Sequence, residues 1–517
     1  MSHDPVLPNP PSGPMLLSPA KRIQATIAAS ALVLFAMLPL AGCQPVNPDK
    51  EVEVYRKILD SKVHRVEPPA AGSPLTLGVA MALTNQTNED LAQRGEDYLQ
   101  ALIARNRAVA SFLPTVSFQP NFTIEQRATG NGATGVGPAG TGIGSGGTAG
   151  GTGTSSTGAV GSGGFRNSGS TSLRFEAPVV GNINLFRGFG DLANLATVEA
   201  QIEQRRALLL DAQAALLLNT AQVFYQVLRS EQQAEVLRKT LQTQDARVTD
   251  EEQRLKNGLS TNLAVAQTRA QAADTRARLA LAEGDVGNAR NTLSLLTGLP
   301  EVAHPLVDDF AVPDAALRQS DDAIIAAALL GREDLRAAEA GVRAARSAVD
   351  AAIAQYYPSV SLNVSGFLYR EFFSDASKWN AVLSANLPIF SAGIIEADVR
   401  TSWSRLRQAA LFESGLRRRV IDDVRQATLN LRTAERRLKA LADQVAAAAE
   451  ALRQAQSALA NKLAIVLDVL NAQDQLLNAQ LLLTGAKFDR TVFYLDLLRA
   501  TGALPQVTQS AATRPAS

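Results

Sequence analysis

The single cysteine, Cys43, is the residue whose type and surroundings most clearly indicate chemistry in this sequence. A basic pair at 21–22 precedes an apolar run at 23–40, and Ala41-Gly42 stands directly before the cysteine. This order is typical of an export signal with a cleavage site. A cysteine directly after the small pair is typical of the bacterial lipobox, in which the diacylated cysteine becomes the mature N-terminus. The alternatives are an ordinary secretory signal with an unrelated cysteine, and a translation start at Met15.

The rest of the sequence offers no catalytic or metal-binding set. His64 and His304 are the only histidines after Cys43, and they lie in separate irregular segments. Met81 is the only methionine there, so a relay of soft sulfur ligands for Cu(I) is absent. Without a free thiol, paired metal-ligand spacing or a nucleophile motif, an active site has nothing to build from. We therefore expect neither an enzyme nor a bound cofactor or metal.

Composition narrows the class of protein further. The formal net charge is +1, so no basic field is present to bind nucleic acid. Aromatic residues make up only 5%, and long segments rich in Ala, Glu, Arg, Gln and Leu are typical of long helices. After the export signal no stretch of 18 apolar residues remains, so we expect no membrane-spanning helix. If the mature chain crosses a membrane, it must do so as a closed β-barrel.

A recurring helix-to-strand junction indicates which elements position any functional residues. An alanine-rich helical pattern stops at Tyr356-Tyr357-Pro358 and continues directly as an alternating strand, and residues 112–117 mirror this junction. The two halves of the chain repeat at a spacing of 204 residues. The anchors of this repeat are Phe186 and Phe390, Asn257 and Asn461, and Thr297 and Thr501. Such a repeat implies units stacked about a common axis.

The first half carries about 40 extra residues, because the two junctions are 244 residues apart rather than 204. The extra segment, 129–167, is almost entirely Gly, Thr, Ser and Ala. Such a composition cannot bury enough apolar surface to order itself, so we expect a flexible loop. A folded glycine-rich motif is the alternative, but no helix follows that would bind phosphate.

Four segments alternate apolar and polar residues with a period of two. They lie near 115–125, 171–179, 359–368 and 379–389. One apolar and one polar face is what a barrel wall between lipid and a wet lumen requires. Because four strands cannot close a barrel, several chains must share one.

The remaining sequence predicts two long helical hairpins, at 190–296 and 391–500. Between residues 420 and 459, apolar residues recur at alternating spacings of four and three, which is a heptad seam. A helix of seventy residues is on the order of 100 Å long. Tight turns at Asn257-Gly258 and Asn461-Lys462 end the first helix of each hairpin.

These patterns divide the chain into six expected parts. They are a signal peptide (1–42), a lipid-anchored N-terminal extension (43–73), a first structural repeat (74–300), a connector outside the helices (301–320), a second structural repeat (321–505) and a polar tail (506–517).

The organisation resembles the TolC-like outer-membrane factor family over about residues 74–505. The most specific match is the segment Leu467-Asp468-Val469-Leu470-Asn471-Ala472-Gln473. The other matching segments are Leu75-Thr76-Leu77 with Ala80, Asp334-Leu335 with Tyr357-Pro358-Ser359, and Leu387-Pro388-Ile389-Phe390 with Gly393. Cys43 points to the acylated branch of the family, although Asn47-Pro48-Asp49 only faintly matches the segment that usually follows the cysteine there.

The resemblance implies a mainly α fold with a membrane β-barrel. In the family, three chains form a 12-stranded barrel in the outer membrane that continues as an α-helical tunnel through the periplasm. The implied function is a passive exit duct of a tripartite efflux pump or type I secretion system. The implied partners are two further copies of the chain, a periplasmic adaptor protein, an inner-membrane transporter and outer-membrane lipid.

The resemblance also implies roles for particular residues. The hairpin tips, Asn257, Gly258 and Leu259 with Asn461, Lys462 and Leu463, correspond to the tips that contact the adaptor and close the pore. Asp468 and Asn471 correspond to an acidic pore constriction, with Asn471 replacing one acid. Three copies of Asp468 around an axis would favour cations. Some members carry a gate-locking arginine where this chain has Ala464.

Other interpretations remain open from the sequence. The tips are also ordinary turns, and Asp468 is also a favourable residue near a helix N-terminus. A surface lipoprotein whose coiled coils serve adhesion or envelope spacing would explain Cys43 and the heptads but not four amphipathic strands. Within the duct class, drug efflux and protein secretion are not distinguished, because the energising partner sets the cargo.

Overall fold

The computed structural model describes residues 48–61, 63, 65–70, 72–127, 170–300, 304–313, 319–370, 378–461 and 463–505. The predicted export signal with Cys43, the glycine-rich segment 129–167, Lys462 and the predicted tail 506–517 lie outside these residues. The chain forms two units, 1–58 and 59–517. The first is described only from residue 48, where helix α2 (Pro48–Asp60) begins. All further description concerns the second unit.

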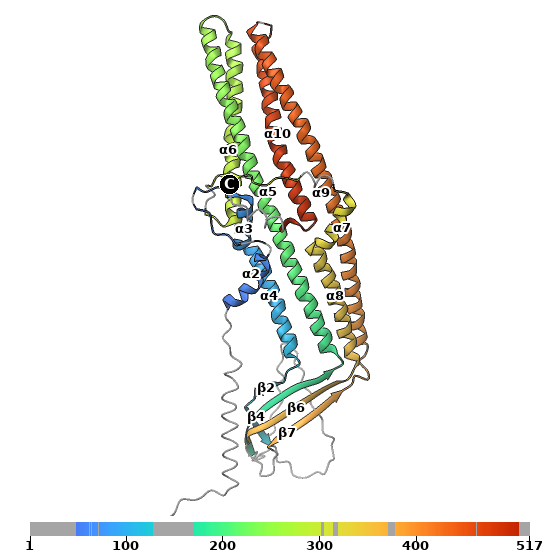
Figure 1. The fold of residues 1–517 in the computed structure, drawn as a ribbon. Coiled ribbons are helices and arrows are strands. Elements are labelled where there is room, and N and C mark those ends of the chain that lie inside the picture. The colour runs from blue at the N-terminus through green and yellow to red at the C-terminus, as the bar shows by residue number, and fades with distance from the viewer. Residues whose placement is uncertain are drawn as a thin grey trace, which may run out of the picture. The chain divides into compact units, whose positions relative to one another are not determined.

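The second unit is mainly α-helical and carries a five-stranded sheet (Figure 1). Its helices are α3 (Leu77–Thr87), α4 (Glu89–Ala110), α5 (Gly190–Lys256), α6 (Asn262–Thr297), α7 (Asp321–Gly331), α8 (Glu333–Ile353), η2 (Ala354–Tyr356), α9 (Ile394–Ala460) and α10 (Val466–Ala500). Its strands are β1 (Leu75–Thr76), β2 (Thr115–Phe118), β3 (Asn121–Arg127), β4 (Ser170–Arg187), β5 (Leu306–Val307), β6 (Ser359–Arg370) and β7 (Trp379–Asn386).

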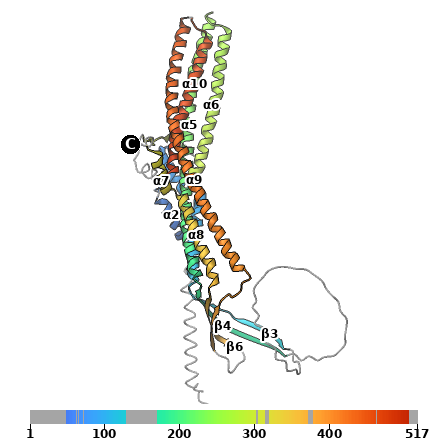
Figure 2. The ribbon, with the colours of Figure 1, turned by 90° about the vertical axis from the view of Figure 1, so that its right-hand side faces the viewer.

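Helices α5 and α9 are both 67 residues long and run from the sheet to the opposite end of the unit (Figures 1 and 2). Neither contains proline, and Gly415 is the only glycine inside α9, so nothing in the sequence interrupts them. Each turns back into a shorter helix, α6 or α10. At 1.5 Å per residue the long helices measure on the order of 100 Å.

The strand order in the large sheet is β2-β4-β6-β7, and β3 also pairs with β4. Neighbouring strands place like residues side by side. One row of paired residues across β4, β6 and β7 is Ile183, Leu362 and Leu383, and the next row is Asn184, Ser361 and Ser384. The sheet therefore has an apolar face and a polar face, as the alternation predicts.

Three strands differ from the sequence expectation. Strand β7 ends at Asn386 rather than near 389, ahead of Pro388. The predicted strand 115–125 is divided into β2 and β3, because Pro120 cannot donate a ladder hydrogen bond. Strand β4 is longer than the predicted 171–179 and continues to Arg187. Irregularities in its pairing at Ala177/Pro178 and Asn184/Phe186 shift the alternation, which hides this continuation from a period-two pattern.

The helices next to the sheet follow the same order as its strands. Helix α4 leads into β2, β4 into α5, α8 into β6, and β7 into α9. Helices α4 and α5, α5 and α8, and α8 and α9 pack as neighbours. The helical layer is thus α4-α5-α8-α9, the continuation of β2-β4-β6-β7.

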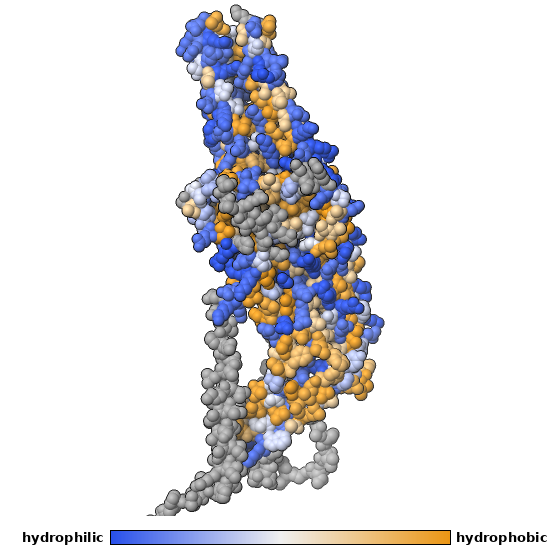
Figure 3. Space-filling model, in the orientation of Figure 1, coloured by the Kyte–Doolittle hydropathy of each residue, from blue (hydrophilic) through white to orange (hydrophobic). Residues whose placement is uncertain are grey.

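The main hydrophobic core lies further from the sheet, where α3, α5, α6, α9 and α10 meet. Fully buried members include Phe224 and Tyr225 of α5, Leu293 of α6 and Leu495 of α10. Figure 3 shows a second gathering of apolar side chains, which is exposed and covers the sheet and the adjoining helix ends. Exposed apolar surface of this kind indicates contact with another molecule or with lipid.

Helix α5 departs from the expectation that no helix could span a membrane. By length and composition alone, an 18-residue window of α5 with mean hydropathy 1.3 could do so, and it is the single such helix among the described residues. Half of that window is buried within the protein. A core helix that packs against neighbouring helices has the same length, hydropathy and burial.

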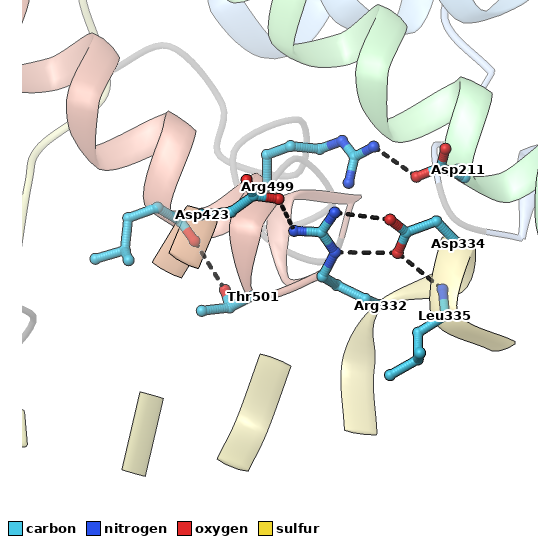
Figure 4. Close-up of polar contacts among 8 residues, drawn as sticks. Asp211, Arg332, Asp334, Leu335, Asp423, Arg499 and Thr501 are labelled. Carbon is cyan, nitrogen blue, oxygen red and sulfur yellow. Dashed lines mark hydrogen bonds and ion pairs between the residues drawn. The ribbon is translucent and has the colours of Figure 1, made fainter. Parts of the chain in front are cut away.

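An ion-pair cluster joins four helices where α10 ends (Figure 4). Arg332 donates to both carboxylate oxygens of Asp334, at 3.0 and 2.7 Å, and to Asp423 of α9 at 2.7 Å. Nearby, Arg499 of α10 pairs with Asp211 of α5 at 2.5 Å. Burial alone would raise the pKa of Asp334, but the hydrogen bonds and charge of Arg332 outweigh it and lower this pKa.

Candidate functional site

The first hairpin tip, residues 257–261, is built by capping interactions. Asn257 caps the C-terminus of α5, and Gly258 follows with φ of 71°, the left-handed conformation that favours glycine. Thr261 begins the return, since its hydroxyl accepts a hydrogen bond from the Ala264 amide at 3.2 Å. Ser260 donates to the buried carboxylate of Glu251 at 2.8 Å, which ties the turn back to α5.

The second tip, residues 461–465, uses different side chains for the same turn. The Asn461 side-chain amide donates to the Ser457 carbonyl at 3.0 Å. Leu463 donates its backbone N–H to the Ala458 carbonyl at 2.8 Å. Lys462 lies outside the described residues, so the structure places five of the six predicted tip residues. Both tips lie at the end of the unit away from the sheet (Figure 1).

Each tip exposes apolar side chains at equivalent positions of the repeat. Leu259 is 78% exposed and Leu463 is 82% exposed, and they are 204 residues apart. Leu263 and Leu467 form a second exposed pair with the same spacing. The second pair lies outside the predicted tip residues, although the repeat spacing also links its two members. Exposed leucines in register on two tips are a surface suited to binding a partner.

Asp468 and Asn471 lie on the exposed face of α10 directly after the second tip. They are three residues apart and therefore neighbours on the helix surface. One oxygen of Asp468 accepts a hydrogen bond from the Ile465 amide at 3.0 Å, so the residue caps the start of α10. The carboxylate nevertheless remains exposed. Geometry thus gives Asp468 the helix-capping role and leaves it accessible to ions.

A polar link between the two hairpins was not found from the sequence. Arg278 of α6 donates to Asn478 of α10 at 3.3 Å and lies 3.8 Å from Asp474. Arg278 also pairs with Asp274 on its own helix at 2.8 Å. Asp274 and Asn478 are repeat equivalents, 204 residues apart, but this spacing alone does not show that the two hairpins meet at Arg278.

The helices around this link bury polar groups that lack partners. Gln244 of α5, Thr275 of α6 and Gln473 of α10 are buried. Each has at least one side-chain oxygen or nitrogen without a hydrogen-bond partner among the described residues. Unsatisfied buried groups weaken packing, because their desolvation is not compensated. Helices α5, α6 and α10 are therefore packed less tightly around this link than they would be along an apolar seam.

Of the two histidines after Cys43, His64 lies outside the described residues and His304 makes a structural contact. His304 is buried, and its Nδ1 lies 3.0 Å from the Ser73 carbonyl oxygen, a contact that fixes the segment beside β1. Within the described residues, no group of three or more His, Cys, Asp and Glu side chains could hold a metal ion.

Comparison with known proteins gives one family. A family model described as Outer membrane efflux protein matches residues 86–299 and 324–503, which together are most of the chain. The matched segments contain both hairpins, all five strands of the large sheet, and both tips.

Two relatives illustrate the sequence similarity. The probable outer membrane lipoprotein SilC of Salmonella typhimurium is 28% identical over 266 residues, covering 50% of this chain and 56% of SilC. The outer membrane efflux protein BepC of Brucella suis is 27% identical over 345 residues, covering 66% of this chain and 73% of BepC. The match to SilC therefore spans about half of that protein.

Among solved structures, the outer membrane protein VceC of Vibrio cholerae has a TM-score of 0.68 at 19% identity. The similarity covers 82% of this chain and 96% of VceC. At this identity the likeness establishes a shared fold. It confirms the predicted fold class, a mainly helical chain with long helices that continue from a β-sheet.

Proposed function

The chain belongs to the outer membrane efflux protein family, and on this premise we propose that it is an outer-membrane exit duct of a tripartite efflux system. Three copies share one barrel in the outer membrane, and their helices form a tunnel through the periplasm. Transport is passive, and an inner-membrane transporter supplies the energy. Efflux of small molecules is preferred to protein secretion because the family description and the name of BepC both specify efflux.

The observation that carries this proposal is the two-faced sheet continuous with the long helices. Its apolar row Ile183, Leu362 and Leu383 suits lipid, and its polar row Asn184, Ser361 and Ser384 suits a wet lumen. An adhesive or spacing lipoprotein would have no use for such a sheet. Cys43, as an acylated residue, would add a lipid tether beside the barrel.

Entry to the tunnel is proposed to lie at the hairpin tips. There the exposed leucines Leu259 and Leu463 bind the periplasmic adaptor, and Asp468 with Asn471 narrows the pore. The weakly packed polar region around Arg278 lets the two hairpins separate when the tunnel opens.

Removing the Arg278 link in Arg278→Ala is expected to increase the open fraction of single channels. Arg276→Ala, which removes an exposed α5–α6 pair, is the matched control.

Conductance of the purified protein in planar lipid bilayers tests the proposal. Discrete channels with a preference for cations are expected, because a ring of Asp468 carboxylates attracts them. Asp468→Asn is expected to reduce the ratio of cation to anion permeability. Asp443→Asn changes an exposed carboxylate within α9, away from the second tip, and should leave this ratio unchanged. Absence of any conductance would contradict the duct, and unchanged selectivity in Asp468→Asn would remove Asp468 from the constriction.

A further inference from the structure

The second unit is an open wall with two free edges. In the sheet, β2 and β3 form one outer edge and β7 forms the other, and every residue of β2 and β7 is exposed. In the helical layer next to the sheet, α4 and α9 lie at the ends of the order α4-α5-α8-α9. Strand β2 follows α4 and β7 precedes α9, so sheet and helices end at the same two edges. An unpaired strand edge presents free N–H and C=O groups and is a template for pairing with another chain.

The free face of α9 carries a row of three residues seven positions apart, Leu411, Arg418 and Arg425. Leu411 is 72% exposed. Both arginines are exposed, and neither has an ion-pair partner among the described residues. Two positions after each arginine come the buried residues Val420 and Ala427. At 100° per residue these buried side chains lie on the opposite side of the helix, so the row points away from the rest of the unit.

The free face of α4 carries a matching row with the same spacing, Glu89, Glu96 and Ile103. Ile103 is 47% exposed, and the two glutamates are exposed without an ion-pair partner in the described part of the chain. Two positions after each glutamate come the buried residues Leu91 and Tyr98. The α4 row therefore also points outward.

Ion pairs across the wall fix the relative heights of the two rows. Asp97 of α4 pairs with Arg205 of α5 at 3.9 Å. Two residues before Arg205, Glu203 of α5 pairs with Arg343 of α8. About one helical turn from Arg343, Glu339 of α8 pairs with Arg417 of α9 at 3.3 Å. This chain of contacts crosses all four helices at one level. Glu96 and Arg418 are the sequence neighbours of its two ends, so they stand at the same height on opposite edges.

We propose that the α9 edge of one copy packs against the α4 edge of the next copy, with Arg418 facing Glu96, Arg425 facing Glu89, and Leu411 facing Ile103. Helix α4 runs toward the sheet and α9 away from it, so one antiparallel register brings all three pairs together. The contact is head-to-tail, and repetition of it closes a ring. The inference rests on the proposed trimeric duct and identifies the surface through which its copies assemble.

The same register contains one unfavourable pair, which supplies a control. Arg107 of α4 and Arg407 of α9 come to the same height, beside the row rather than in it. Removing the positive charge of Arg107 is therefore not expected to weaken assembly. Removing the negative charge of Glu96 is expected to weaken it.

Thiol cross-linking in native membranes tests the contact. Cys43 is the only natural cysteine, so a Cys43→Ser background carrying Glu96→Cys and Arg418→Cys has thiols only at the proposed contact. A short bis-maleimide is expected to convert this variant into covalent oligomers up to a trimer. The control variant pairs Glu96→Cys with Arg453→Cys, an exposed position far along α9, and should remain monomeric after denaturation.

Charge reversal gives an independent readout on the full-length protein. Glu96→Arg and Arg418→Glu are each expected to lower the trimer yield after detergent extraction, and the double reversal is expected to restore it. Arg107→Gln should keep the yield of the natural protein. Trimers that form with an amine-reactive reagent but not through positions 96 and 418 would overturn this contact and leave the duct intact. Failure to trap oligomers with either reagent would overturn both.

Discussion

Arg332 holds a charged cluster together from an almost buried position, with a side chain only 9% exposed. Replacing it by methionine would leave the mostly buried carboxylate of Asp334 without its cation. We expect Arg332→Met to lower the free energy of unfolding by about 3–5 kcal/mol, the cost of breaking a buried ion pair. The apparent midpoint of thermal unfolding in detergent measures this. Arg436→Met, on the exposed surface of α9, serves as the control and should change the midpoint little.

The lowered pKa of Asp334 also predicts a pH dependence. Because the folded-state pKa lies below the ordinary value of 3.8, the stabilisation is complete above that value and is lost as pH falls through the folded-state pKa. The natural protein should therefore lose stability more steeply below about pH 3.8 than Asp334→Asn, which has no carboxylate to protonate there. Unfolding midpoints measured from pH 7 to pH 2.5 compare the two. Parallel curves would show that Asp334 does not contribute.

At the scale of elements, the hairpin tips are the parts whose function can be separated from their folding. Leu259→Ser and Leu463→Ser remove exposed apolar side chains without removing a cap, so trimer yield should stay constant. Drug tolerance of cells that depend on this duct should fall, because the adaptor loses its contact. Leu281→Ser removes a comparably exposed leucine from the middle of α6 and should have no effect. Equal tolerance in all three variants would exclude the tips as the adaptor-binding surface.

The class of each element could be predicted from the sequence because period and composition are local properties. The uninterrupted heptad seam predicts α9, and the alternation from Trp379 predicts β7. Strand boundaries were harder, because Pro120 interrupts one strand and pairing irregularities shift another. The link from Arg278 to Asn478 joins residues 200 positions apart and depends on how two hairpins pack. No local pattern encodes such a contact.

For the whole molecule, the sequence indicated that the strands of one chain are too few to close a barrel. It could not indicate which surfaces meet. The rows on α4 and α9 are each visible as heptad spacing, yet their equal height follows only from ion pairs across four packed helices. Assembly is therefore the property that most needs the structure, and the proposed duct depends on it.

The number of chains in the extracted complex decides whether several copies share one barrel. Native mass spectrometry of the protein in mild detergent measures it against the mass of the single denatured chain. We expect a complex of three chains, which gives twelve strand positions to a shared barrel, because β2 and β3 lie one after the other along β4 and occupy one position. A stable, folded monomer would leave both edges of the sheet unpaired and would exclude the shared barrel.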